Sequence, residues 1–282
     1  MKNTRLIQII VLASVVLVMG FLLFKPVKGL VNEDEKTAEA SESSDASAAQ
    51  FNLSSVSEAA KRGLNPSIVN EITELEAQAN KADGDEKVKI YQQIADKWND
   101  VEKAVPQAYV YEEMAKLTPK FEYWLKSGDN FRKGYTNLQD TVLATVLNKK
   151  AIEVYQKAVD LDGSNLDAKT GLGAAMVTGT NNPMAGIAIL REVVQAEPRN
   201  VEANRTLGLF SLQSRQFDLA IDRFKTVIEQ KPDAESYFYL ATGYENIGMK
   251  NEAIAAFQKS KELAADPSLS QFIDRRIEEL SK

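Results

Sequence analysis

Carboxylates are the side chains of this chain that could support catalysis. The 282-residue sequence contains no histidine and no cysteine. Nucleophilic catalysis by a Ser–His or Cys–His pair is therefore excluded, as is a zinc site built from those ligands. Asp96 and Asp129 could in principle act as an acid and base pair, but nothing in the sequence fixes their separation and ordinary surface carboxylates are far more common. We predict no enzymatic activity, no catalytic residue and no cofactor.

One acidic stretch has some of the features of a calcium-binding loop. The run Val159–Asp167 is rich in Asp and Asn. An EF-hand loop that began at Asp160 would need glycine where Asn165 stands and glutamate where Gly171 stands. A turn between two helices explains the run better, with Ser164 or Asn165 capping the helix that follows. We predict no metal site.

The charge of the chain argues against nucleic-acid binding. The sequence has 34 basic and 40 acidic residues, a formal net charge of −6, and its basic residues form no stripe. Binding to nucleic acid needs clustered lysine and arginine to contact phosphates. No phosphate-binding glycine signature is present either. We therefore expect no nucleic-acid partner.

Helical periodicity runs from residue 65 to the C-terminus without convincing strand alternation. The clearest segment is Val201–Asp233, in which two apolar-periodic stretches are joined at residues 214–216. Gly208 and Ala220 are small enough to let two helices approach, while Leu207 and Phe224 would fill the space between them. Similar sets of residues recur about 34 residues away on either side.

This pattern resembles the tetratricopeptide repeat (TPR), a helix–turn–helix unit of about 34 residues. The resemblance is strongest from residue 166 to 266 and extends back to residue 88. It implies an all-α fold, a right-handed superhelical solenoid of about five helix pairs with a capping helix at 267–282. The five predicted units are residues 88–120, 121–165, 166–200, 201–233 and 234–266, preceded by an N-terminal helix at 61–87. Extra residues near 134–147 should lengthen the helices or bulge from one edge.

The N-terminal part is predicted to be a membrane anchor followed by a tether. Leu6–Phe24 carries no charge and as a helix would rise about 28 Å, close to the roughly 30 Å hydrocarbon core of a bilayer. Residues 1–28 are thus predicted as a transmembrane segment with its flanks, a cleaved signal peptide being the alternative. The short N-terminal tail favours a cytoplasmic N-terminus and a periplasmic repeat body. Residues 29–60 are acidic and rich in Ser and Ala, which predicts a flexible linker.

The resemblance also implies a binding groove, since in family members the first helices of the units line a concave surface that contacts extended peptides. The residues at matching positions are Leu125, Arg132, Thr170, Ala174, Val177, Arg205, Leu209, Leu212, Phe238, Thr242 and Glu245. The alternative is a solvated inner face. An apolar strip of Leu209, Leu212 and Phe238 favours the groove, because large exposed apolar patches usually mark interfaces. A clamp for acidic tails is not implied, because Leu209 and Thr242 stand where such domains carry lysine and asparagine.

Together these features predict a membrane-anchored TPR scaffold or chaperone-like protein that binds other proteins or extended peptides through its concave surface. One alternative is an adaptor subunit of a membrane complex on the cytoplasmic side, which requires the opposite topology. A distant alternative is an enzyme that uses carboxylates. The sequence names neither the partner nor the oligomeric state.

Overall fold

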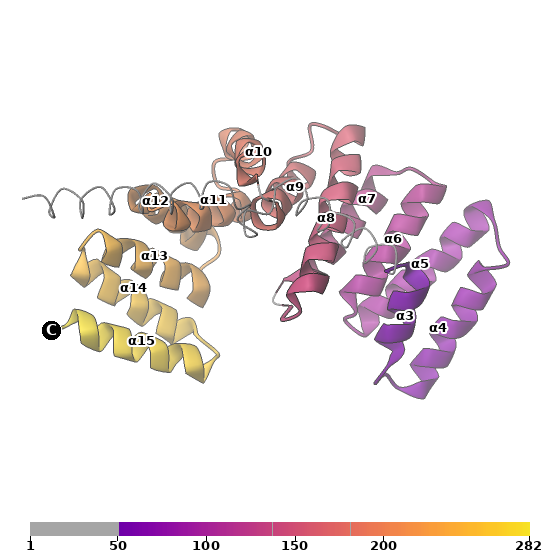
Figure 1. Ribbon diagram of the computed structural model, residues 1–282, viewed down its shortest axis with the longest axis horizontal. Helices are drawn as coiled ribbons and strands as arrows, with labels where there is room; N and C mark the ends of the chain where they lie inside the picture. Colours follow the sequence, from indigo (N-terminus) through magenta and orange to yellow (C-terminus); the bar gives the residue numbers. More distant parts are fainter. Residues whose placement is uncertain (1–50, 137, 181) are drawn as a thin grey trace, which may run out of the picture. The chain divides into compact units, whose positions relative to one another are not determined.

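The computed structural model describes residues 51–136, 138–180 and 182–282, and within these ranges every regular element is an α-helix (Figure 1). The helices are α3 (Leu53–Lys61), α4 (Pro66–Ala79), α5 (Gly84–Asp100), α6 (Ala104–Leu117), α7 (Phe121–Tyr135), α8 (Thr141–Leu161), α9 (Leu166–Gly179), α10 (Pro183–Ala196), α11 (Val201–Gln213), α12 (Phe217–Gln230), α13 (Ala234–Asn246), α14 (Lys250–Leu263) and α15 (Pro267–Leu280). The prediction of an all-α fold is confirmed for the described residues. The right-handed sense of a superhelix stays a prediction.

Consecutive helices pack against each other as pairs. From α4 to α15 each helix contacts the next one along the chain (Figure 1). Further contacts join helices two places apart, namely α7 with α9, α9 with α11, and α11 with α13. Two described helices correspond to each of the five predicted repeat ranges, although α5 begins at Gly84, before the predicted start at residue 88. The range 61–87, predicted as one N-terminal helix, instead contains α4, the last residue of α3 and the start of α5. The division into units stays a prediction. The first helices α7, α9, α11 and α13 therefore lie next to one another, as a shared binding surface requires.

Apolar side chains between the helices form the core. Leu207 and Phe224 are both buried, as their positions in the repeat pattern indicate. A Cβ on Gly208 would lie 2.9 Å from Phe224 Cε2, so only a glycine allows α11 and α12 to approach this closely. At the C-terminal end, Ile273 of α15 is fully buried in the cluster that contains Phe257. The last helix thus covers apolar surface that a solenoid end would otherwise expose.

Side-chain caps begin several of the helices. The side chains of Asn165 and Asn200 accept hydrogen bonds from backbone N–H groups in the first turns of α9 and α11, at 3.0 and 2.9 Å. Asp233 caps α13 in the same way at 2.8 Å. Each cap satisfies a donor that the first helical turn leaves unpaired. Asn165 therefore has the capping role expected of the acidic run 159–167.

The extra residues near 134–147 lengthen a helix. At 21 residues, α8 is longer than any other described helix. The carboxylate of Asp140 caps it by accepting from the backbone N–H groups of Val142 and Leu143, each at 3.0 Å. Leu143 packs against the core cluster around Phe131, while Val142 is 66% exposed. The insertion is therefore a packed helical extension with one apolar side chain left outside.

The predicted flexible linker at 29–60 extends too far toward the C-terminus, because residues 53–61 form α3. Asn52 and Ser55 make a reciprocal capping box at the start of this helix. Val56 is buried against the core, and Lys61 forms an ion pair with Glu76 of α4 at 2.5 Å. Few apolar residues are needed when a short capped helix docks on a preformed surface, so composition alone misassigned this segment. Residues 29–50 lie outside the described part of the chain.

The predicted single-pass membrane localisation requires correction. Among residues 51–136, 138–180 and 182–282, no helix is both long enough and apolar enough to span a bilayer. The described helices instead bury one apolar face and carry charged residues elsewhere, as helices of a folded repeat array do. The described helices therefore give no support to the predicted single-pass membrane protein with a periplasmic repeat body. The predicted span itself, Leu6–Phe24, lies outside the described residues.

Candidate functional site

A pocket of about 440 Å³ opens where three first helices, α7, α9 and α11, meet. The residues that line it are Leu125, Asp129, Arg132, Lys133, Asp167, Thr170, Gly171, Asn200, Val201 and Glu202. We call it the inner pocket. It brings together three residues predicted for the groove, namely Leu125, Arg132 and Thr170. The shared surface of the first helices is therefore hollowed at these positions and carries both apolar and charged side chains.

Tyr155 of α8 reaches the inner pocket from the core. Its side chain is fully buried, and its ring lies against Gly128 of α7 and Gly171 of α9. A Cβ on Gly128 would lie 2.6 Å from Tyr155 Cε1, and one on Gly171 would be closer still. The two glycines thus provide the space for the ring between the first helices. At its far end the hydroxyl donates to Asp129 Oδ1 at 2.7 Å, which holds this carboxylate at the pocket.

An ion pair links α7 and α11 at the pocket. Arg132 Nη1 donates to Glu202 Oε1 at 2.9 Å, and the two side chains are 34% and 37% exposed. Burial by itself lowers the pKa of Arg132, but Glu202 and the neighbouring Tyr155 and Asp129 raise it above the usual value. The guanidinium therefore stays charged, and Glu202 supplies the matching negative charge.

Asp129 is the pocket carboxylate whose environment disfavours its charge. Burial raises the pKa of Asp129 above its ordinary value, and the negative charge of Asp167 adds to the rise. The hydrogen bond from Tyr155 and the charges of Arg132 and Lys133 act in the opposite direction without cancelling it. The groups around Asp129 therefore stabilise its negative charge less well than water would.

Thr170 of α9 adds a buried polar group to the same pocket. Its side chain is 6% exposed, and its hydroxyl has no hydrogen-bond partner in the described part of the chain. A buried hydroxyl without a partner costs free energy, so most such groups in folded proteins are satisfied. Thr170 thus brings a buried hydroxyl without a hydrogen-bond partner to the lining that it shares with Asp129 and Arg132.

The other predicted residues of α9 do not line the inner pocket. Ala174 is 5% exposed, and its small side chain lies in the packed part of the helix. Val177 is half-buried and packs against the cluster that includes Ile187 and Leu190. These two positions contribute to packing between α9 and its neighbours.

Arg205 of α11 is engaged within the protein. Its Nη2 pairs with Asp233 at 2.6 Å, its Nη1 donates to Ser236 Oγ at 2.7 Å, and the side chain is 17% exposed. Asp233 is also the residue that caps α13. Arg205 therefore joins α11 to the start of the next first helix.

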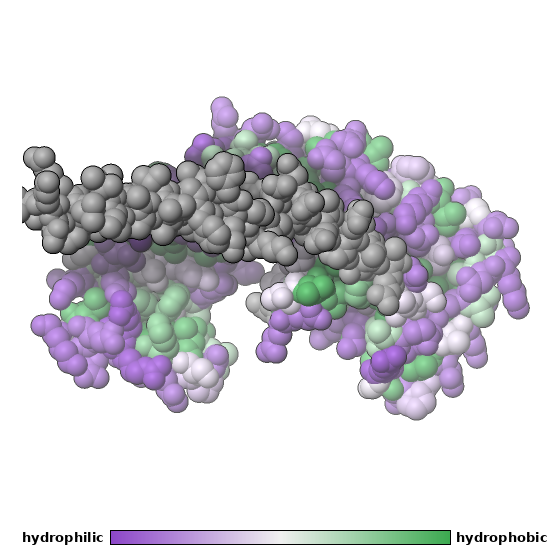
Figure 2. All heavy atoms as spheres, in the orientation of Figure 1, coloured by the Kyte–Doolittle hydropathy of each residue, from purple (hydrophilic) through white to green (hydrophobic). Residues whose placement is uncertain are grey.

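The predicted apolar strip is more covered than the sequence indicates. Leu209, Leu212 and Phe238 are half-buried and pack against the C-terminal core cluster. The ring of Phe238 lies 5.6 Å from that of Phe257 and 5.9 Å from that of Phe272 on α15. Hydrophobic side chains are visible over α13 to α15 beside hydrophilic ones (Figure 2). The strip therefore belongs mainly to the packing of the C-terminal helices.

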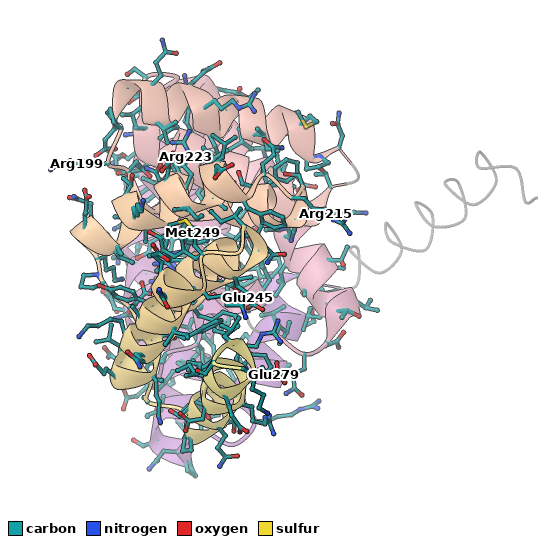
Figure 3. All side chains as sticks on the ribbon, turned by 90° about the vertical axis from the view of Figure 1, so that its left-hand side faces the viewer. Arg199, Arg215, Arg223, Glu245, Met249 and Glu279 are labelled. Carbon is teal, nitrogen blue, oxygen red and sulfur yellow. The ribbon has the colours of Figure 1, made fainter. Side chains whose placement is uncertain are left out.

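Thr242 and Glu245 of α13 also have partners inside the protein. Thr242 donates to the carbonyl of Phe238 in its own helix at 2.9 Å. Glu245 accepts from Arg276 Nε of α15 at 3.1 Å, and Arg276 Nη1 pairs with Glu279 at 2.5 Å. Glu245 and Glu279 accordingly lie near each other in Figure 3. The helix predicted as a cap thus occupies part of the surface predicted as a groove.

The sequence pattern did not assign Tyr155, Asp167 or Glu202 to a site. Tyr155 fits the apolar positions of a second helix, so it was expected only in the core. Gly128 and Gly171 on the flanking first helices were the sequence signal that could have placed the Tyr155 ring between α7 and α9. Asp96 of α5 is exposed, accepts from Gln92 at 2.8 Å and does not line the inner pocket, so the pocket contains only one member of the proposed acid and base pair.

No metal-binding arrangement accompanies the pocket. In the ranges that the structure describes, no three or more His, Cys, Asp or Glu side chains are grouped so that they could hold a metal ion. What the inner pocket can do chemically is to form hydrogen bonds and ion pairs. It supplies carboxylates, a paired guanidinium, a free hydroxyl and an apolar wall from Leu125 and Val201.

Comparisons with known proteins find one matching family model and several solved structures that are similar to parts of the chain. Residues 234–267 match the family model of the tetratricopeptide repeat. A MamA fragment (41-end) from Desulfovibrio magneticus RS-1 is similar in structure, with a TM-score of 0.51 and 20% identity over 64% of this chain and 97% of that one. Two other solved structures are a MamA protein (TM-score 0.49, 26% identity, 62% and 90% covered) and YrrB, described as a TPR protein with an unusual peptide-binding site (0.47, 18%, 66% and 91%). No curated protein matches the chain.

Proposed function

We propose that this chain is a non-enzymatic scaffold that binds an extended segment of another protein along the first helices of its array, with the inner pocket as the main contact. The observation that carries the proposal is the convergence of side chains from α7, α9 and α11 on one hollow. The repeat match at 234–267 supports the same class of function, because stacked repeats present extended surfaces that bind partners.

The size and lining of the inner pocket suit a side chain of a bound segment. About 440 Å³ lies within the range of roughly 300–1,000 Å³ seen for ligand pockets. Leu125 and Val201 give it apolar walls, while Asp129, Arg132 and Thr170 can orient polar atoms. A few well-placed polar groups within an apolar surround are the usual basis of specificity.

The test is to fill the pocket without disturbing the fold. Asp167 is exposed at the second position of α9 and lines the pocket, so a tryptophan there would occupy the hollow. Asp218 is exposed at the second position of α12 and is the matched control. Peptides are first selected from a random library on the immobilised full chain. Their affinities are then measured for the full chain, Asp167→Trp and Asp218→Trp.

We expect Asp167→Trp to weaken the selected peptides by about tenfold or more, which corresponds to about 1.4 kcal/mol. Asp218→Trp should bind them as the unchanged chain does. Circular dichroism should give equal helicity for all three proteins. Equal affinities for the two variants, or a library that enriches no peptide, would contradict the proposed function.

A further inference from the structure

The charges of the inner pocket are not balanced. Glu202 and Arg132 neutralise each other through their 2.9 Å ion pair. Asp129 and Asp167 remain, and the only other lining cation among the described residues is Lys133, which is exposed at the rim. A long, exposed lysine side chain can move into solvent at little cost, whereas Asp129 is held in place by Tyr155. The fixed part of the pocket therefore carries excess negative charge.

The two carboxylates come from neighbouring first helices and act on the same space. Asp129 lies on α7, and Asp167 is the second residue of α9. Tyr155 is the one hydrogen-bond donor to the Asp129 side chain among the described residues, and Asp167 forms no ion pair with them. The charge of Asp167 also raises the pKa of Asp129, by less than the charge of Arg132 or of Lys133 lowers it, so the two acids lie within electrostatic reach of each other. A cation between them would remove this repulsion.

Thr170 gives the pocket a second feature that points to a ligand. Its hydroxyl is buried, unpartnered and on a residue that lines the hollow. In a helix threonine populates two χ1 rotamers, so a rotation can turn the hydroxyl toward a bound group. The hydroxyl can then accept a hydrogen bond from an N–H donor. An N–H-rich cation would satisfy Thr170 and both carboxylates together.

The apolar lining fits the rest of such a ligand. Lysine and arginine carry their charge on an aliphatic stem that packs along apolar surface. Leu125 and Val201 provide that surface next to the carboxylates. An acidic side chain would instead meet Asp129 and Asp167. The fixed cation of the pocket, Arg132, pairs with Glu202 through Nη1, while its Nε is buried without a hydrogen-bond partner among the described residues.

We propose that the inner pocket receives a lysine or arginine side chain of the bound segment, with its cation between Asp129 and Asp167 and its stem against Leu125. This inference rests on the proposed function and names the chemistry that the partner must supply at this position. The bound segment would therefore carry a positive charge at this position. An inner face rich in lysine would instead select segments with acidic tails.

The experiment uses small probes, so that it does not depend on finding the partner. N-acetyl-arginine methylamide and N-acetyl-lysine methylamide are titrated into the full chain, with N-acetyl-citrulline methylamide as the neutral analogue of arginine and N-acetyl-glutamate methylamide as the acidic one. Binding is followed by NMR through the methyl signals of Leu125, Thr170 and Val201, which line the pocket. We expect the arginine and lysine probes to shift these signals with affinities about fivefold or more above that for citrulline.

Matched variants then show which groups cause the preference. Asp129→Asn with Asp167→Asn keeps the size of both side chains and lets Tyr155 still donate to residue 129, so the fold should be retained. This double variant should bind the arginine probe no better than citrulline, whereas Asp218→Asn on α12 should leave the preference unchanged. Glu202→Gln, which frees Arg132, should improve binding of the glutamate probe.

Each remaining outcome counts against the inference. Equal affinities for arginine and citrulline, a preference for glutamate in the unchanged chain, absence of any shift, or an unaltered preference in the double variant would overturn it. The proposed function would survive these results if the peptides selected from the library still bound more weakly to Asp167→Trp than to the unchanged chain. If the library selection failed while the arginine and lysine probes still bound, the inner pocket would bind cations but the proposed peptide binding would be refuted.

Discussion

Replacing Tyr155 by phenylalanine isolates the hydrogen bond that holds Asp129 at the inner pocket. The tyrosine hydroxyl donates to Asp129 Oδ1 at 2.7 Å, and the side chain is fully buried. Phenylalanine keeps the ring between Gly128 and Gly171, so the packing of α7, α8 and α9 should not change. The substitution thus removes the donor to Asp129 and leaves a partly buried carboxylate without it, and it also removes the oxygen that acts on the neighbouring Arg132.

The expected cost follows from the charge of the acceptor. Hydrogen bonds to charged groups contribute about 1.5–3 kcal/mol, and neutral ones about 1 kcal/mol. We expect Tyr155→Phe to lower the free energy of unfolding by about 2 kcal/mol at neutral pH. In a protein that already carries Asp129→Asn, the same change should cost only about 1 kcal/mol, because the acceptor is then neutral. The difference is the coupling between the hydroxyl and the charge.

The cost should also depend on pH. The pKa of Asp129 is raised in the folded protein by burial, so its charged form is destabilised there relative to the unfolded chain. As the pH falls from neutral through this raised pKa, the folded state takes up a proton before the unfolded state does, and the penalty is relieved. The effect of Tyr155→Phe should therefore shrink toward that of a neutral hydrogen bond at about pH 4.

Urea denaturation followed by circular dichroism provides the assay. Four proteins are compared at neutral pH and at about pH 4, namely the unchanged chain, Tyr155→Phe, Asp129→Asn and the double variant. Equal slopes of free energy against urea would show that the compared states are the same. A cost below about 0.5 kcal/mol, or the same cost with and without the Asp129 carboxylate, would refute the assigned role of Tyr155.

Four further substitutions test the fold. Gly208→Leu should cost about 1–3 kcal/mol in urea denaturation, because even a Cβ would lie 2.9 Å from Phe224 Cε2; an unchanged midpoint would refute this packing. Ile273→Ala should cost about 2–5 kcal/mol, because the side chain is fully buried. Phe272→Ala, at a side chain 46% exposed, should cost less, and equal costs would show that α15 does not cover the core. Asn52→Ala removes the capping box of α3 and should cost about 1 kcal/mol, seen as faster amide exchange in residues 53–61; wild-type exchange rates would contradict it.

Much of the helical array could be predicted because its signals are local. Asn200 caps α11, and Leu207 and Phe224 lie at core positions that recur with the repeat. Each helix packs mainly on its chain neighbours, so a pattern of about 34 residues carries most of the information that a pair needs. α3 was missed because its stability depends on docking, with Val56 buried in a core that distant helices supply.

The candidate site was only partly predictable. Leu125, Arg132 and Thr170 do line the inner pocket. Phe238 and Glu245 have matching positions in their own unit but contact α15 instead. Position within a repeat indicates that a side chain faces the shared surface of the first helices. It does not show whether another helix of the same chain already lies there.

By itself, the sequence determined the helices of the repeat array, their pairing and the small and large residues between them, because these depend on contacts within about one repeat. Only the tertiary structure decided which polar groups share a pocket. Arg132 and Glu202 are brought to 2.9 Å from helices that are separated along the chain by three others, α8, α9 and α10. Tyr155 reaches Asp129 because two glycines leave room for its ring. Such contacts depend on how successive first helices stack, and the spacing of residues along the chain does not specify that geometry.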